Sequence, residues 1–246
     1  MKNIKGSGKR DHDLFYENED YTDRDSKETF KLALSKIKEY KKDSHRNMSI
    51  ADFGCASGEF LYHYNKVFPM DDLNGIDILD SSLKVLKKNI PNAKIHNKDV
   101  LSKNSFNKDS FDIITAFGFL GCFDDIEPIL ENFMHWLKPD GYLICHCLIN
   151  EFNYDVILRY KESDDSQNEM QTGWNIFSQN TIRKILLKGR TERIEFNKFE
   201  MFIDLEKKLE DPMRSWTELD NSGNRMITNA LHINQPQYFL EVIKGK

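Results

Sequence analysis

Two glycines and one acid, close together in the sequence, could bind a ligand that contains a ribose. Segment 51–58 reads ADFGCASG, so Gly54 and Gly58 follow directly on a short apolar run. Glycine has no side chain, so the chain can turn tightly there and a ligand can lie against bare backbone. Asp77 follows Gly58 by 19 residues. A carboxylate at about that spacing suits hydrogen bonds from ribose hydroxyls, because the second strand lies beside the first.

The elements that must position these residues alternate between strand and helix. Apolar runs predict strands at residues 48–53, 73–78, 94–96, 111–117 and 142–148. Helical spacing of apolar residues predicts helices at residues 25–41, from about 59, around 83–90, and at 126–137. After residue 150 we expect a helix near 179–187, a strand-like stretch at 193–203 and a last strand at 238–243. Such alternation predicts parallel strands with ligands bound outside their carboxyl ends.

Several segments, in this order, resemble the motifs of the class I SAM-dependent methyltransferase family. Asp52, Gly54 and Gly58 match its first motif, acid-x-Gly-x-Gly-x-Gly, with Ala56 at the middle glycine. Asp77 matches its ribose-binding acid. Further matches are the Asp99-Val100 pair, FDII at 111–114 and LKPDGYL at 137–143. The resemblance covers roughly residues 48 to 148, and four signals in order are far more specific than one glycine turn.

The resemblance implies a fold, a cofactor and a set of binding residues. The fold is a Rossmann-like three-layer α/β sandwich with a mostly parallel seven-stranded sheet and an antiparallel last strand. The cofactor is S-adenosylmethionine (SAM), and the product is S-adenosylhomocysteine. The residues expected to hold SAM are Asp52, Gly54, Cys55, Ala56, Gly58, Asp77, Ile78, Asp99, Val100 and Phe117, with Tyr16 closing over it.

We expect residues 1–246 to form one domain. Residues 1–47 would be an N-terminal arm and helix, 48–148 the SAM-binding core, and 149–246 the acceptor-binding elaborations and last strands. The length suits a single domain of this class.

Composition excludes several classes of protein. The net charge of −5 disfavours bulk nucleic-acid binding. No apolar run approaches the roughly 20 residues of a membrane-spanning helix, and the charged N-terminus lacks a signal core, so we expect a cytoplasmic protein without membrane association. The four cysteines lack metal-ligand spacing; in Cys145-His146-Cys147, strand alternation separates the histidine from the thiols. We therefore expect no metal. Oligomeric state is not indicated.

Other functions remain as alternatives. An NAD-dependent enzyme would need a third glycine where Glu59 stands. A base-amine methyltransferase would carry Asp/Asn-Pro-Pro-aromatic after the fourth strand, where this chain has TAFG at 115–118. An RNA or protein methyltransferase and a non-catalytic SAM-binding protein stay open.

The methyl acceptor should be a small molecule bound by the arm and residues 151–235. His146 and Glu151 are candidate bases by position, although a hydrogen-bonded strand histidine is as good an interpretation of His146. Arginines in loop-like sequence favour an anionic acceptor, and this region faintly resembles methyltransferases of bacterial capsule and sugar modification. The residues expected to bind the acceptor are Arg214, Arg225, Trp174 and Trp216.

Overall fold

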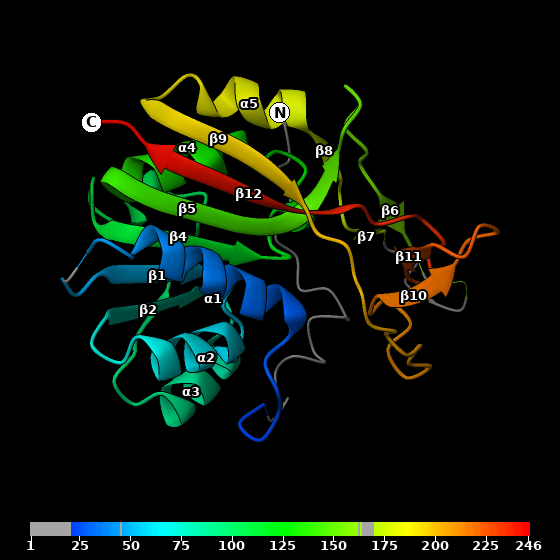
Figure 1. The fold of residues 1–246 in the computed structure, drawn as a ribbon, viewed down its shortest axis with the longest axis horizontal. Coiled ribbons are helices and arrows are strands. Elements are labelled where there is room, and N and C mark those ends of the chain that lie inside the picture. Colours follow the sequence, from blue (N-terminus) through cyan, green and yellow to red (C-terminus); the bar gives the residue numbers. More distant parts are fainter. Residues whose placement is uncertain (1–20, 45, 162, 164–169) are drawn as a thin grey trace.

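The computed structural model describes residues 21–44, 46–161, 163 and 170–246. Its centre is a twisted sheet with the strand order β3-β2-β1-β4-β5-β12-β9, to which β8 adds by pairing with the end of β5 (Figure 1). Strands β3, β2, β1, β4 and β5 are parallel, whereas β12 runs antiparallel to both β5 and β9. The expected seven-stranded, mostly parallel sheet with an antiparallel last strand is confirmed, with β8 as an addition.

The elements follow the expected alternation. The helices are α1 (Glu28–Tyr40), α2 (Glu59–Val67), α3 (Asp80–Asn89), α4 (Glu127–Trp136) and α5 (Gln179–Leu186). The sheet strands are β1 (Ser49–Phe53), β2 (Asp72–Asp77), β3 (Lys94–Asn97), β4 (Phe111–Phe117), β5 (Leu137–Asn150), β8 (Phe177–Ser178), β9 (Thr191–Lys198) and β12 (Gln237–Lys244). Two hairpins lie outside the sheet, namely β6 (Arg159–Tyr160) with β7 (Gln171–Thr172), and β10 (Trp216–Leu219) with β11 (Arg225–Thr228).

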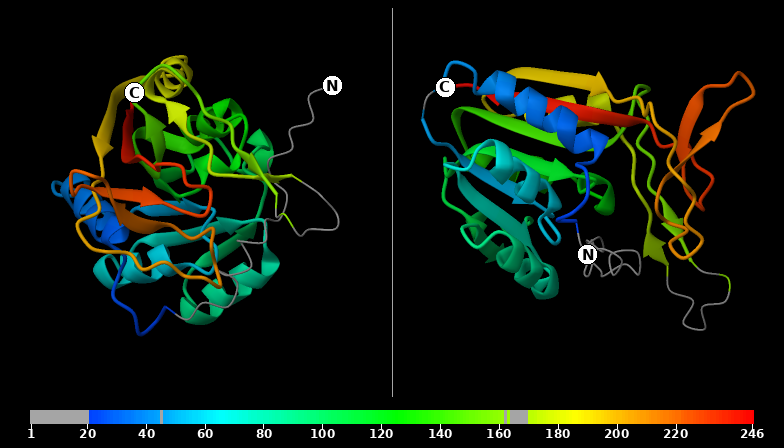
Figure 2. Two further views of the ribbon diagram at one scale, coloured as in Figure 1. Left: turned by 90° about the vertical axis from the view of Figure 1, so that its right-hand side faces the viewer. Right: turned by 60° about the horizontal axis from the view of Figure 1, so that its bottom comes forward.

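Helices cover both faces of the sheet. Apolar side chains of α1, α2 and α3, such as Ile37, Leu61 and Leu86, form one core cluster, and those of α4 and α5, such as Phe133 and Ile182, form the other (Figure 2). Burying an apolar side chain of this size contributes about 1.5 to 3 kcal/mol. The two clusters hold the strands rigidly, so the loops at the carboxyl ends of β1, β2 and β4 have fixed starting points.

A buried carboxylate joins α1 to the far side of the sheet. Glu241 of β12 accepts hydrogen bonds from Lys36 (2.6 Å), Tyr142 (2.5 Å) and Asn197 (2.6 Å). These donors hold the pKa of Glu241 below its usual value despite its burial. These donors come from α1, β5 and β9 and stabilise the charged form of Glu241. The carboxylate in turn anchors α1 over β5, β9 and β12.

Two strand boundaries differ from the sequence-based expectation. Strand β5 begins before the Lys-Pro-Asp-Gly turn, because Leu137 already pairs with Phe111, and residues 138–141 then bulge out before Tyr142 pairs with Ile113. Strand β9 ends at Lys198 rather than near 203. Beyond it, residues 199–236 form the extension that carries β10 and β11, on the right in Figure 1. Within the described part of the chain, no helix is both long and apolar enough to cross a bilayer.

Candidate functional site

The loop between β1 and α2 makes two sharp turns in the left-handed backbone region. Gly54, Ala56 and Gly58 have φ angles of +67°, +46° and +90°. The Gly54 N–H donates to the Ile76 carbonyl on β2 (2.9 Å), and the Gly58 N–H donates to the Cys55 carbonyl (2.9 Å). Glycine adopts such angles without strain, whereas a residue with a Cβ pays for them. The loop therefore needs its two glycines for backbone shape alone.

The space beside these glycines is occupied by protein side chains. A Cβ built on Gly54 would lie 2.3 Å from the ring of Phe119, and a Cβ on Gly58 would lie 2.5 Å from Leu86 of α3. Phe119 and Leu86 thus occupy the space on the Cβ side of the glycines, and the contact of a ligand with the bare loop backbone stays a prediction. The two glycines let the loop pack against its own core.

Asp77, at the end of β2, holds the loop in place. Its Oδ2 accepts the Ala56 N–H (2.9 Å), and its Oδ1 accepts the Leu79 N–H (3.0 Å). Each carboxylate oxygen can accept more than one hydrogen bond. The half-buried Asp77 therefore orients the loop and has the chemistry that ribose hydroxyls require.

Asp52, at the end of β1, lies beneath the same loop. It is buried and accepts a hydrogen bond from the Thr115 hydroxyl of β4 (2.7 Å). Burial raises the pKa of Asp52 to about 7; the Thr115 bond opposes this shift, and the negative charge of Asp77 adds to it. Asp52 therefore titrates near neutral pH and links β1 to β4 under the loop.

Of the other residues expected to hold SAM, two are exposed and two are buried. Ile78 is half exposed directly after Asp77, which is unusual for an isoleucine and leaves an apolar surface beside the acid. Asp99 is exposed after β3, and its carboxylate accepts the Leu101 N–H (2.9 Å). Val100 is buried, and its carbonyl accepts from Asn132 of α4. Cys55 is buried too, so only its main chain can reach a ligand.

Aromatic rings surround the end of β4. The Phe117 ring lies 4.4 Å from that of Phe60 and 5.2 Å from that of Phe30. Tyr21, which precedes α1, is fully buried against Tyr62 of α2 (ring centroids 5.6 Å apart), and its hydroxyl donates to the Ser57 carbonyl of the glycine loop. Sequence reasoning missed Tyr21, because a single tyrosine in a polar stretch gives no signal of its partner.

Comparison with known proteins agrees with this geometry. Residues 24–188 match the methyltransferase domain family. The chain belongs to the class I, SAM-dependent methyltransferase family. It is 22% identical over 144 residues to malonyl-[acyl-carrier protein] O-methyltransferase of Bacillus cereus, covering 56% of this chain and 53% of that protein. It is 27% identical over 103 residues to demethylmenaquinone methyltransferase of Lactococcus lactis, covering 40% and 41%. The chain thus spans about half the length of the curated relatives it matches.

Solved structures show the same fold. The N-methyltransferase NodS of Bradyrhizobium japonicum, in complex with S-adenosylhomocysteine, superposes with a TM-score of 0.55 at 13% identity, covering 96% of this chain and 97% of that one. SAM is the cofactor of this methyltransferase, and its residues fit the ligand. The carboxylate of Asp77 is a hydrogen-bond acceptor of the kind that ribose hydroxyls need, Ile78 offers an apolar face, and the loop 54–58 is held by hydrogen bonds.

His146 of this methyltransferase lies on β5, in register with Phe117 of β4 and Phe239 of β12. Burial lowers the pKa of His146 to about 4, and Gln237 beside it opposes only part of the shift. The His146 Nε2 and the Gln237 Oε1 are both buried and make no hydrogen bond of good geometry with a described residue, but the two side chains lie close enough to interact with each other. Buried polar atoms are rarely left with poor hydrogen bonds, so this pair is a candidate contact for a bound molecule.

Three of the residues expected to bind the acceptor pair with acidic side chains of the extension. Arg214 pairs with buried Asp211 (2.9 Å), and Arg225 pairs with Asp204 (2.7 Å). Trp216 is buried and donates to Glu218, so it packs the small sheet rather than walling a pocket.

Three further predicted residues have different outcomes. The main chain at Trp174 and Asn175 lies against Gly121, in the loop after β4, so Trp174 does approach the carboxyl edge of the sheet. Glu151 accepts a hydrogen bond from Tyr238, which occupies this candidate base. Tyr16 lies outside the described residues.

Proposed function

We propose that this chain transfers a methyl group from SAM to a small molecule. The observation that carries the proposal is the hydrogen bond from Ala56 to Asp77, because it joins the glycine loop to the acid that suits a ribose. Family membership supports the reaction. The names of two relatives, which act on malonyl-acyl-carrier protein and demethylmenaquinone, support a metabolic acceptor.

SAM supplies an electrophilic methyl on a positively charged sulfur. With SAM bound, the acceptor's lone pair would form the new bond to the methyl carbon while the carbon–sulfur bond breaks and its electron pair stays on sulfur, and an O–H or N–H acceptor would release its proton to solvent. Alignment of the reactants can supply roughly 7 to 11 kcal/mol of the acceleration at best. In this chain, Asp77 and the loop orient the cofactor, and the rings of Phe30, Phe60 and Phe117 exclude water at the end of β4.

His146 is better suited to bind the acceptor than to remove its proton. An imidazole with a pKa of about 4 is neutral at pH 7 and is a weak base there. We infer that one hydroxyl or amine of the acceptor bonds to both His146 Nε2 and Gln237 Oε1. A group that donates one hydrogen bond and accepts another would satisfy both buried atoms.

The surroundings of this pair favour a largely apolar acceptor. The rings of Phe199 and Phe239 lie 5.8 and 5.2 Å from the His146 ring, with Phe117 next to it in register. The expected anionic acceptor loses its support, because Arg214 and Arg225 already pair with carboxylates. A sugar-related or capsule acceptor stays a prediction.

The test combines binding with turnover. Calorimetry with SAM and with NAD establishes the cofactor, and product S-adenosylhomocysteine is then measured over a panel of neutral and anionic metabolites, RNA and protein. We expect the chain to bind SAM but not NAD, and to methylate a neutral small molecule. Turnover of RNA or protein only, or SAM binding without turnover of any acceptor, would support the alternative functions instead.

Two variants test the acceptor contact. His146→Phe and Gln237→Met should each raise the KM of the acceptor about five- to 150-fold, the scale of one lost hydrogen bond to a buried group, while SAM affinity changes less than twofold. If both side chains bind the same acceptor group, the effects in the double variant should be less than additive. A fall in kcat with unchanged KM in His146→Phe would instead make His146 a base. Additive effects in the double variant would mean that the two side chains do not bind the same acceptor group.

A further inference from the structure

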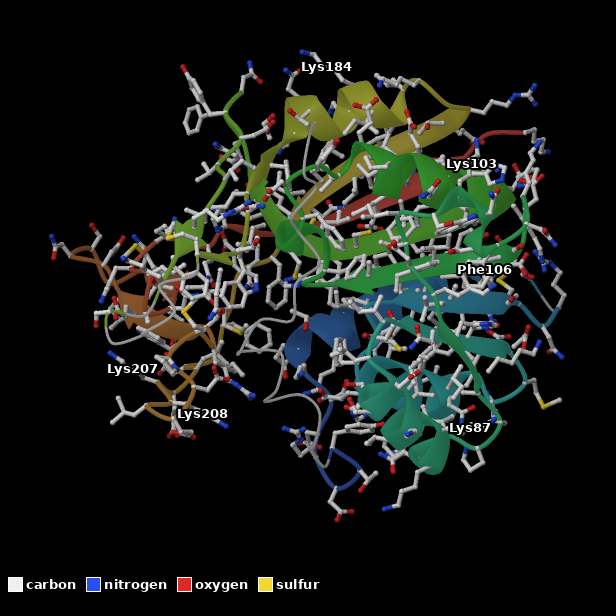
Figure 3. All side chains as sticks on the ribbon, turned by 180° about the vertical axis from the view of Figure 1, so that it is seen from behind. Lys87, Lys103, Phe106, Lys184, Lys207 and Lys208 are labelled. Atoms are coloured by element: carbon white, nitrogen blue, oxygen red, sulfur yellow. The ribbon has the colours of Figure 1, made fainter. Side chains whose placement is uncertain are left out.

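A cavity of about 440 Å³ lies at the edge of the sheet opposite the glycine loop. It forms where β4 and β5 begin and β12 ends, between the C-terminal ends of α4 and α5. Figure 3 shows Lys103, one of its residues, at the end of the molecule away from Lys207 and Lys208 of the extension. Its basic residues are Lys103, Lys108, Lys188, Arg190, Lys244 and Lys246.

This cavity has an excess of positive charge. Two acids, Asp109 and Glu131, line it beside the six basic residues, and Glu127 and Asp140 next to it pair with Lys188 and Lys246, which leaves two positive charges in a chain whose net charge is −5. Lys244 pairs with Asp109 (2.7 Å). By contrast, Lys103 makes no ion pair with a described residue, and the Arg190 guanidinium donates to the main-chain carbonyl of Lys246 (3.1 Å). Lys108, Lys188 and Lys246 pair with carboxylates as well. Lys103 and Arg190 are therefore the two basic residues of the lining that make no ion pair with an acidic side chain in the described part of the chain.

The positive charge of the cavity affects the pKa of His135 of α4, which also lines it. Burial lowers the pKa of His135, and the positive charges of Lys103, Lys244 and Lys108 lower it further against the opposing effect of Asp109. A positive potential that disfavours the charged imidazole favours an anion at the same place.

The floor of the cavity is apolar. Leu130 and Met134 of α4 and Ile185 and Leu186 of α5 line it below the charged rim. Its volume lies within the roughly 300 to 1,000 Å³ typical of small-molecule sites. A ligand that fills it would thus carry a compact anion at one end and an apolar part at the other.

We propose that this cavity binds a small organic phosphate, with the phosphate held by Lys103 and Arg190 and the organic part lying on the floor formed by α4 and α5. Guanidinium and ammonium groups are the usual protein partners of phosphate, and Arg190 can bind it bidentately. The site is separate from the methyl-transfer site, since it lies at the amino ends of the parallel strands.

The test uses the full chain at low ionic strength, with phenyl phosphate and inorganic phosphate as probes. We expect phenyl phosphate to bind severalfold more tightly, because its ring reaches the apolar floor. Lys103→Gln and Arg190→Gln should each weaken its binding about five- to tenfold. Lys184→Gln, an equal charge change at an exposed position of α5 that does not line the cavity, is the matched control and should change binding less than twofold.

Histidine NMR gives a second measurement at the site. Saturating phenyl phosphate should raise the pKa of His135, whereas that of His96 on β3, which does not line the cavity, should not move. Equal weakening by Lys184→Gln, an unmoved His135, or equal affinity for both probes would overturn the proposal. Binding to phosphatidic acid vesicles without binding of phenyl phosphate would assign these cations to a lipid surface and overturn it as well.

Discussion

Replacing Asp77 by alanine should weaken SAM binding through two effects. The carboxylate would no longer accept hydrogen bonds from the ribose hydroxyls. In addition, the Ala56 and Leu79 N–H groups, which it accepts at 2.9 and 3.0 Å, would lose their partner. The glycine loop would then be released from β2 on one side.

The size of each effect follows from these contacts. Lost charge-assisted hydrogen bonds cost about 1 to 3 kcal/mol, which is a five- to 150-fold rise in the Kd of SAM. We expect the upper half of this range, because release of the loop adds to the loss. The free energy of unfolding without ligand should fall by about 1 to 2 kcal/mol, since two half-buried amides lose an acceptor. Asp77→Asn keeps one acceptor oxygen and should give intermediate values.

Calorimetry with SAM and urea unfolding without it measure the two effects separately. Asp72→Ala is the matched control, because Asp72 is an exposed acid at the other end of β2 that pairs with Lys94 (2.8 Å). It should leave the Kd of SAM within twofold of the wild-type value. A folded Asp77→Ala variant with normal SAM affinity, or an equal loss in Asp72→Ala, would refute the assignment of Asp77.

Three further outcomes are expected. Gly58→Val should lower the melting temperature of the unliganded protein, because its Cβ meets Leu86 at a φ of +90°; an unchanged melt with lost SAM binding would support a ligand-facing role for this glycine. Asp52 has a folded pKa of about 7, above its unfolded value, so its contribution to stability is complete in acid and is lost as pH rises through 7. Asp52→Asn should therefore gain stability relative to wild type, by about 3 kcal/mol, between pH 5 and pH 8, and a pH-independent difference in melting temperature would contradict this. Tyr21→Phe should cost about 1 kcal/mol of unfolding free energy and raise the Kd of SAM, because the carbonyl of Ser57 loses its donor; calorimetry that shows unchanged affinity would limit Tyr21 to stability.

The sequence alone predicted the fold and the cofactor end of the site. Alternating strands and helices, the glycine turn at 54–58 and Asp77 are local features, and a right-handed crossover places consecutive parallel strands side by side. Adjacent β1 and β2 therefore bring Ala56 and Asp77 together without knowledge of distant contacts. The residue types and their spacing were therefore sufficient to predict the contact between the glycine loop and Asp77.

Tertiary structure decided the acceptor end and the basic cavity. Gln237 reaches His146 only because β12 runs antiparallel beside β5 in one register, with Phe239 opposite His146. Arg225, a candidate anion ligand by sequence, is paired with Asp204, which lies 21 residues away. Cross-strand neighbours and ion-pair partners depend on how the whole core packs, and a shift of one residue would turn every side chain of β12 to the other face. Local sequence therefore predicts which strands form, whereas packing of the complete chain determines which side chains meet.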